Sequence, residues 1–311
     1  MTKVHKPRKP IRWALYLMLV PGIIITAIYS YGAIIGNVIA FQRYNFTNRG
    51  FFGLFKSPWI GFANFSYIFA LRDFKRAFGN TLYLSVFSIV LGILVPLVVS
   101  LLLNEVRHTG YKRAVQTLIY LPFFISWVIV AGIMQNILSP SSGVVNHVMG
   151  FFGIKPIFFL ADPKVFRAVL IISNQWKGFG MGTIIYLAAL TAIDPSLYEA
   201  AGIDGANRFK KMLYISLPGL IPIIVLNGTL SLGSVLNSNF DQIQNLYSTV
   251  VYSTGDVIDT LVYRLGIQPI NAALPRYDLA SAIGLFKSAI SFVLVSVTYF
   301  FAYKFADYRI F

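Results

Sequence analysis

The sequence predicts an all-α integral membrane protein with six transmembrane helices. Only 12% of its 311 residues are charged and 57% are hydrophobic, whereas soluble domains carry about 25% charged residues. The mean hydropathy is +0.69. Apolar runs that reach the roughly 20 residues needed to cross a bilayer recur along the whole chain. Together these observations favour a helical bundle in lipid over a soluble helical protein.

Six apolar runs are long enough to span, and they lie at 13–41, 81–104, 114–138, 165–192, 214–237 and 280–303. The first run follows a basic segment, 1–12, and exceeds the roughly 7–15 apolar residues of a signal peptide. It therefore indicates an uncleaved first span. The fourth run is the least regular, because SNQWKGFGMG interrupts its apolar sequence. We expect residues 13–311 to form one six-span membrane domain.

The distribution of basic residues predicts the orientation of these spans. If the N-terminus is inside, the inner segments hold 13 Lys and Arg in 50 residues, and the opposite loops hold 10 in 107. Cytoplasmic loops of membrane proteins are enriched in Lys and Arg. We therefore expect both termini, and the segment 193–218, to be cytoplasmic.

Composition excludes several classes of function. The net charge of +15 lies mostly at the chain ends and in the loops, so contact with lipid headgroups explains it better than nucleic acid does. The absence of cysteine removes disulfides, thiol catalysis and Cys-ligated metals. The three histidines, His5, His108 and His147, form no metal-binding motif. We expect no metal site and no nucleic-acid partner.

The segment 193–218, between spans four and five, carries its own helix signals. Asp194 can cap a helix and Pro195 suits the first helical position, whereas Gly205 permits a tight turn. Phe209 follows on an apolar face that lies opposite a basic face. We expect a helix–turn–helix that docks into a groove of a partner protein. The alternative is an amphipathic loop lying on the lipid surface.

This segment resembles the EAA loop of ABC-importer permeases, whose pattern is EAA-x3-G-x9-I-x-L-P. The matching positions are Glu199, Ala200, Ala201, Gly205, Ile215, Leu217 and Pro218. Asp204, Gly205, Ala206 and Phe209 further resemble the carbohydrate-uptake, maltose-type branch. FDQIQNLYSTVVYSTGDVIDTLVYRLG and ASAIGLFKSAISFVLV are similar to permeases for oligosaccharides from complex polysaccharides.

The resemblance implies a multi-pass subunit of a sugar importer in a bacterial cell membrane. Such importers combine two different permease subunits, two cytoplasmic ATPase subunits and an extracellular solute-binding protein. The EAA loop would dock on the ATPase, with Glu199 and Gly205 central. The chain has no GxxxxGK[ST] phosphate-binding motif, so we expect ATP and Mg²⁺ to be used by the partners. We expect no catalytic residue and no cofactor here.

Polar residues inside spans are costly, which makes them default candidates for a substrate path. Span four carries Asn174, Gln175, Trp176 and Lys177, and amides beside an aromatic ring suit a sugar. The alternative is that Trp176 belongs to the interfacial aromatic belt and Lys177 extends to the interface.

Further polar candidates are Asn227, Ser231, Ser234 and Asn237 in span five, Asp241 at its outer end and Lys287 in span six. The span-five residues predict a wet path or, alternatively, interhelical hydrogen bonds. If Lys177 and Lys287 face one cavity, an acidic sugar such as a uronate would fit.

Two other classes of membrane protein fit the sequence less well. A glycosyltransferase would need clustered acids or a DxD motif, and the 11 acidic residues are dispersed. A secondary transporter predicts inverted repeats and a coupling carboxylate at midplane, and neither is visible. An importer for amino acids or phosphate remains the alternative for the substrate.

Overall fold

The computed structural model describes residues 13–44, 53–268 and 274–306. Helices make up the regular structure of these ranges, with a single isolated bridge between Gln42 and Trp59. The all-α membrane fold predicted from the sequence is therefore confirmed. The basic segment 1–12 lies outside the described residues.

Four helical segments are long and apolar enough to cross a membrane, and up to six if two bent pairs each count as one span. The elements are α1 (Trp13–Thr26), η1 (Ala27–Tyr31), α2 (Gly32–Gly36) and η2 (Asn37–Phe41) in the first span, then α5 (Arg72–Asn104), α6 (Thr109–Phe124) with α7 (Trp127–Ile137), α9 (Pro163–Thr191), α11 (Arg208–Lys211) with η3 (Met212–Ser216) and α12 (Leu217–Gly233), and α16 (Tyr277–Ala306).

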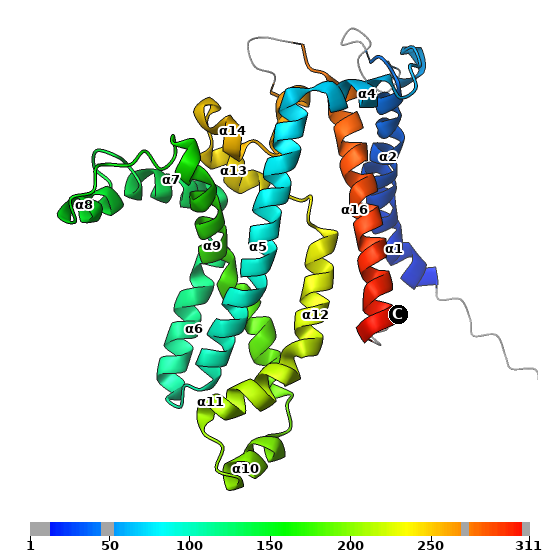
Figure 1. Cartoon of the computed structure of the whole chain (residues 1–311). Coiled ribbons are helices and arrows are strands. Elements are labelled where there is room, and N and C mark those ends of the chain that lie inside the picture. Colours follow the sequence, from blue (N-terminus) through cyan, green and yellow to red (C-terminus); the bar gives the residue numbers. More distant parts are fainter. Residues whose placement is uncertain (1–12, 45–52, 269–273, 307–311) are drawn as a thin grey trace, which may run out of the picture.

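Shorter helices gather at both ends of the bundle (Figure 1). The end drawn at the top, called the upper end here, carries α3 (Gly53–Lys56), α4 (Ala63–Ala70), α8 (Val144–Phe151), α13 (Phe240–Leu246), η4 (Thr249–Val251), α14 (Tyr252–Gly255) and α15 (Ile258–Gly266). The lower end carries α10 (Pro195–Ile203) and α11. The first span begins, and α16 ends, on the side of the lower end.

The third predicted span is not straight, because the chain bends by 103° between α6 and α7. Ile125 takes an extended backbone conformation after α6. Ser126 then caps α7, since its Oγ accepts a hydrogen bond from the backbone N–H of Ile129 at 3.4 Å. α7 therefore turns toward α13 across the upper end (Figure 1). The apolar run did not reveal this bend, because it continues from the end of α6 into α7 with no polar residue other than Ser126.

By contrast, α9 continues as one helix through the polar stretch of span four. Its glycines let neighbouring helices approach closely, as small residues do in membrane bundles. A Cβ on Gly180 would lie 2.0 Å from the carbonyl oxygen of Ile119 on α6, and one on Gly182 would lie 2.8 Å from Cγ of Pro96 on α5. α9 is thus held between α5 and α6.

A buried polar cluster ties α14 and α15 to the upper end of α5. Asp256 is fully buried, and its two carboxylate oxygens accept hydrogen bonds from Arg264 at 2.8 and 3.2 Å. The amide of Asn80 on α5 donates to the backbone oxygen of Asp256 at 2.8 Å. Burial raises the pKa of the Asp256 carboxyl, and the Arg264 guanidinium opposes that rise. These bonds fix the short helices above the spans.

We expect Gly180→Ala to destabilise the protein, because the added methyl group meets the backbone of α6. Overpacking of this kind costs roughly 1–3 kcal/mol. Gly178→Ala on the same helix is the matched control, since its Cβ meets nothing within 4 Å. Replacing a helical glycine by alanine there should gain about 0.5–1 kcal/mol. Thermal unfolding of both purified variants measures the difference. An unfolding temperature of Gly180→Ala at or above wild type would contradict the close contact.

Candidate functional site

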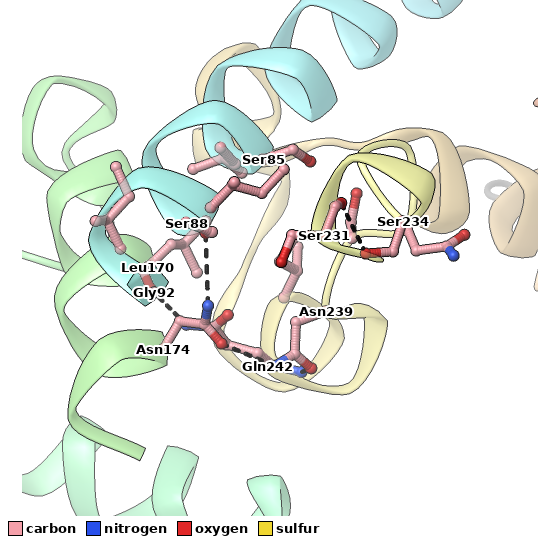
Figure 2. Close-up of a pocket in the computed structure, with 15 residues that line it drawn as sticks. Ser85, Ser88, Gly92, Leu170, Asn174, Ser231, Ser234, Asn239 and Gln242 are labelled. Carbon is pink, nitrogen blue, oxygen red and sulfur yellow. Dashed lines mark hydrogen bonds between the residues drawn. The ribbon is translucent and has the colours of Figure 1, made fainter. Parts of the chain in front are cut away.

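A polar cavity of about 340 Å³, called the upper cavity here, lies where α5, α9, α12 and α13 meet. Its polar lining comprises Ser85, Ser88, Asn174, Ser231, Ser234, Asn237, Ser238, Asn239 and Gln242. Figure 2 shows side chains from these elements around one space. All of these polar groups are hydroxyls or amides, and none of the described residues that line the cavity is charged. The wall can therefore exchange hydrogen bonds with a neutral polar ligand.

Asn174 connects three elements of this wall, as Figure 2 shows. Its Nδ2 donates to Oγ of Ser88 at 3.5 Å, and its Oδ1 accepts from Nδ2 of Asn239 at 3.1 Å. Asn239 also caps α13 by accepting from the backbone N–H of Gln242 at 3.4 Å. Gln242 in turn donates to the backbone oxygen of Leu170 on α9 at 2.7 Å. The wall is thus held in place by its own polar side chains.

A second cavity of about 300 Å³, called the lower cavity here, adjoins the first. The two share Gly92, Ser231 and Ser234. Further toward the lower end, Asn227 on α12 adds an amide to its wall, and Tyr186 on α9 also lines it, with its hydroxyl buried. The two cavities share a polar strip along α12 formed by Asn227, Ser231 and Ser234, whereas glycine and isoleucine make up most of the lower wall from α5 and α9. A strip of this kind is the arrangement expected of a path through the bundle.

Several candidates predicted from the sequence lie on this strip. Asn174 and Asn237 line the upper cavity, Asn227 lines the lower one and Ser231 lines both. Among the other candidates, the amide of Gln175 donates to the backbone oxygen of Ser88 at 3.1 Å. Asp241 lies in the first turn of α13 and is exposed. The contacts of these residues with a substrate remain predictions.

Trp176 and Lys177 line neither cavity. Nζ of Lys177 donates to the backbone oxygen of Phe123 at 2.7 Å. It also lies 5.3 Å from the ring centroid of Phe123 and 5.6 Å from that of Trp127. Lys177 therefore contacts the C-terminal end of α6 at the α6–α7 bend. A cation is stabilised there by the free carbonyl groups of the helix end and by the faces of the aromatic rings. Trp176 is 43% exposed.

Lys287 contacts a different partner from Lys177, and neither lysine lines the upper or the lower cavity. Its ammonium forms an ion pair with Asp259 on α15. The second carboxylate oxygen of Asp259 accepts a hydrogen bond from the backbone N–H of Ser238 at 3.2 Å. Because Ser238 lines the upper cavity, this pair supports the cavity wall from behind.

Sequence reasoning missed the contribution of α5. Ser85 and Ser88 lie one turn apart, and Gly92 follows one turn later, so all three lie along one side of α5 and line the upper cavity. In the sequence, the signal for this polar side of α5 was the helical spacing of small residues inside an apolar run. Asn239 was missed because it stands in the connection between α12 and α13.

The segment 193–218 forms the two helices α10 and α11, which are joined by a turn at the lower end. Gly205 lies in the turn with φ of +75°, a conformation that favours glycine. Asn207 then caps α11 by accepting from the backbone N–H of Lys210 at 2.9 Å. The tight turn expected at Gly205 is therefore present.

Internal bonds hold the two halves of this segment together. Nζ of Lys211 donates to the backbone oxygen of Tyr198 at 2.8 Å, and the hydroxyl of Tyr198 is 2.9 Å from that of Ser216. Large apolar side chains nevertheless stay exposed, with Ile203 at 88% and Phe209 at 64%. The segment is a preformed unit that presents an uncovered apolar surface.

Comparison with known proteins agrees with this architecture. Residues 88–310 match the family described as binding-protein-dependent transport system inner membrane component. Protein LplB of Bacillus subtilis is 38% identical over 294 residues, which cover 94% of this chain and 89% of the relative. The polygalacturonan/rhamnogalacturonan transport system permease protein YteP of the same organism is 38% identical, with coverage of 94% and 88%.

A solved structure is similar over nearly the whole chain. It is a chain of a bacterial ABC transporter involved in the import of the acidic polysaccharide alginate. The match has a TM-score of 0.85 and 41% sequence identity, and it covers 94% of this chain and 96% of that one. A second crystal structure, of a bacterial alginate ABC transporter in complex with an alginate pentasaccharide-bound periplasmic protein, matches with a TM-score of 0.83. The chain therefore belongs to the family of inner membrane components of binding-protein-dependent transport systems.

Proposed function

We propose that this chain forms half of the path by which an ATP-driven importer moves an oligosaccharide across the membrane. The observation that carries the proposal is the set of hydroxyls and amides around the upper cavity, which continues along α12 into the lower cavity. Sugar hydroxyls both donate and accept hydrogen bonds, so such a wall matches them without a metal or a charge. Relatives that transport polygalacturonan, rhamnogalacturonan or alginate support this substrate class.

We propose that Lys177 and Trp176 border the path. A positive charge at this position favours an acidic oligosaccharide as the substrate. An ammonium facing lipid at midplane costs at least about 2.5 kcal/mol, which favours a protein or water surface for Lys177. We expect the second permease subunit to complete the path on this side of α9. There Lys177 would meet a carboxylate and the ring of Trp176 would stack on a sugar face.

The partners and orientation follow from the same proposal. A second permease, two cytoplasmic ATPase subunits and an extracellular binding protein would complete the importer. We place the lower end, with both chain termini, in the cytoplasm. The support is the higher density of basic residues on that side and the direction of α1 and α16, since α1 begins and α16 ends on the side of the lower end (Figure 1).

The segment 193–218 is the proposed contact with the ATPase subunits. It is preformed by internal hydrogen bonds, and its exposed apolar side chains suit docking into a groove. Glu199 is exposed on α10, where it can meet a basic group of the partner. Because this chain lacks a phosphate-binding motif, we place ATP and Mg²⁺ in those subunits.

The substrate class can be tested with the complete transporter in proteoliposomes. We expect alginate oligosaccharides or oligogalacturonides, supplied with the binding protein, to stimulate ATP hydrolysis and to enter the vesicles. Galactooligosaccharides serve as the neutral comparison. They carry hydroxyls but no carboxylates, so a weaker response to them would indicate that the charge of Lys177 contributes to recognition. Stimulation by amino acids or phosphate, with none by any oligosaccharide, would overturn the proposal.

The coupling role predicts that Gly205→Val abolishes substrate-stimulated ATP hydrolysis. A β-branched residue at φ of +75° costs about 1–2 kcal/mol and distorts the docking turn. Gly153→Val is the matched control, since Gly153 has φ of +73° and equally open surroundings but lies near α8. Glu199→Lys should also uncouple hydrolysis, by reversing charge at the contact.

Membrane insertion, measured by the amount of purified complex, should be retained in all three variants. If Gly205→Val and Glu199→Lys both hydrolyse ATP like wild type in response to substrate, then the segment is a surface loop and the coupling role is wrong.

A further inference from the structure

An arm formed by α7, α8 and the connection to α9 (residues 127–161) projects from the upper end of the bundle. Figure 1 shows α7 and α8 crossing the direction of the spans, with α8 at the far end of the arm. α7 has 11 residues and α8 has 8, and apolar helices this short lie in a protein core, in a re-entrant loop or at the membrane surface. α7 packs on α13, but α8 packs extensively on no other helix in the described part of the chain. A core position is therefore excluded for α8.

The orientation of α8 is fixed by a buried asparagine. Nδ2 of Asn146 donates to the backbone oxygens of Ser139 and Ile157, both at 3.0 Å, and its Oδ1 accepts from the backbone N–H of Ile157 at 2.8 Å. These bonds hold the segment after α8 against the segment before it. Gly153 makes the intervening turn with φ of +73°, a conformation that favours glycine. α8 is thus preformed without any partner.

The side of α8 opposite Asn146 is apolar and uncovered. Val144, Val148 and Phe151 follow one another at the spacing of a single helix face, and they are 64%, 49% and 85% exposed. Phe152 continues this face at the end of the helix and is also exposed. A contiguous group of exposed apolar side chains marks a surface that contacts a membrane or another protein. Something outside this chain therefore covers α8.

Lipid is the neighbouring phase at the periphery of a membrane domain, and the apolar exposure extends along the arm. α6 and α7 together form one apolar run that is broken by the 103° bend. Ile129 and Ile133 lie one turn apart on α7 and are exposed, whereas Val130 and Ala131 are buried. The arm therefore presents apolar side chains on both of its helices, as expected of a segment that lies on lipid.

The charge of the arm also fits a lipid surface. The segment 139–161 contains Lys155 and His147 but no Asp or Glu, and both side chains are exposed. Asp162, the next residue, caps α9, because its carboxylate accepts from the backbone N–H of Lys164 at 2.9 Å. Lipid phosphates would therefore meet a cation and no free carboxylate on α8 or its flanks. An apolar helix face combined with a basic edge is the pattern of helices that lie in the interface.

We propose that α8 lies in the lipid interface at the upper end of the bundle, with its apolar face among the acyl chains and Lys155 near the phosphates. The partner is the lipid itself, so this inference does not depend on which solute is transported. It also connects the lipid surface to the wall of the upper cavity. Nε2 of Gln135 on α7 donates to the backbone oxygen of Asn245 on α13 at 3.4 Å, and Gln242 of α13 lines that cavity.

Spin labels on single cysteines test this position in the complete transporter, with the partner subunits made free of cysteine. The chain itself contains none. The transporter is placed in vesicles of phosphatidylcholine and phosphatidylglycerol, and the accessibility of each label to oxygen and to a water-soluble nickel complex gives its depth. We expect labels at Phe151→Cys and Val148→Cys to lie about 5–10 Å below the phosphates. Both positions are exposed, so these variants should fold.

Gly150→Cys is the matched control on the same helix. Gly150 is exposed on another side of α8, and a Cβ there meets nothing within 4 Å. Its label should lie at or above the phosphates and should be reached by the nickel complex. Equal access of the nickel complex to Phe151→Cys and Gly150→Cys would place the arm in water and overturn the proposal. Protection of Phe151→Cys from both oxygen and nickel would overturn it as well, because a protein such as the second permease would then cover α8.

Discussion

The close packing of α9 between α5 and α6 is the contact on which the rest of the structure depends. Glycine at 180 lets α9 approach the backbone of α6, and glycine at 182 lets it approach Pro96 on α5. Helices in a membrane gain little from excluding water, so such close contacts supply much of their association. The same packing brings Asn174 and Tyr186 of α9 toward the polar sides of α5 and α12, which creates both cavities.

The upper end then determines the shape of the path. Asp256, Arg264 and Asn80 fix the short helices to α5, and Gln242 fixes α13 to α9. The ion pair between Lys287 and Asp259 holds the connection that precedes α13. Charged residues therefore support the wall from outside the cavities, while neutral hydroxyls and amides face the inside. In the proposed path, the walls of these cavities bind sugar hydroxyls, and a substrate carboxylate would be met by Lys177 outside them.

Local sequence signals predicted a large part of this arrangement. Apolar runs gave the membrane-spanning segments, because span length depends only on hydrophobicity and helix rise. The spacing around Gly205 gave the turn of the EAA loop, and polar residues in spans four and five gave part of the cavity wall. The α6–α7 bend was missed because it depends on the backbone at Ile125 and Ser126 inside an apolar run. The partner of Lys287 was missed because tertiary packing alone brings Asp259 to it.

The central claim is that the polar strip along α12 faces a water-filled path. The chain contains no cysteine, so a single cysteine in the complete transporter can be probed with a membrane-impermeant thiol reagent. Ser231 lines both cavities, whereas its neighbour Leu232 is exposed outside them. The account predicts labelling of Ser231→Cys during transport, protection by substrate and little labelling of Leu232→Cys. Labelling of Leu232→Cys alone, with Ser231→Cys unreactive throughout the cycle, would contradict it.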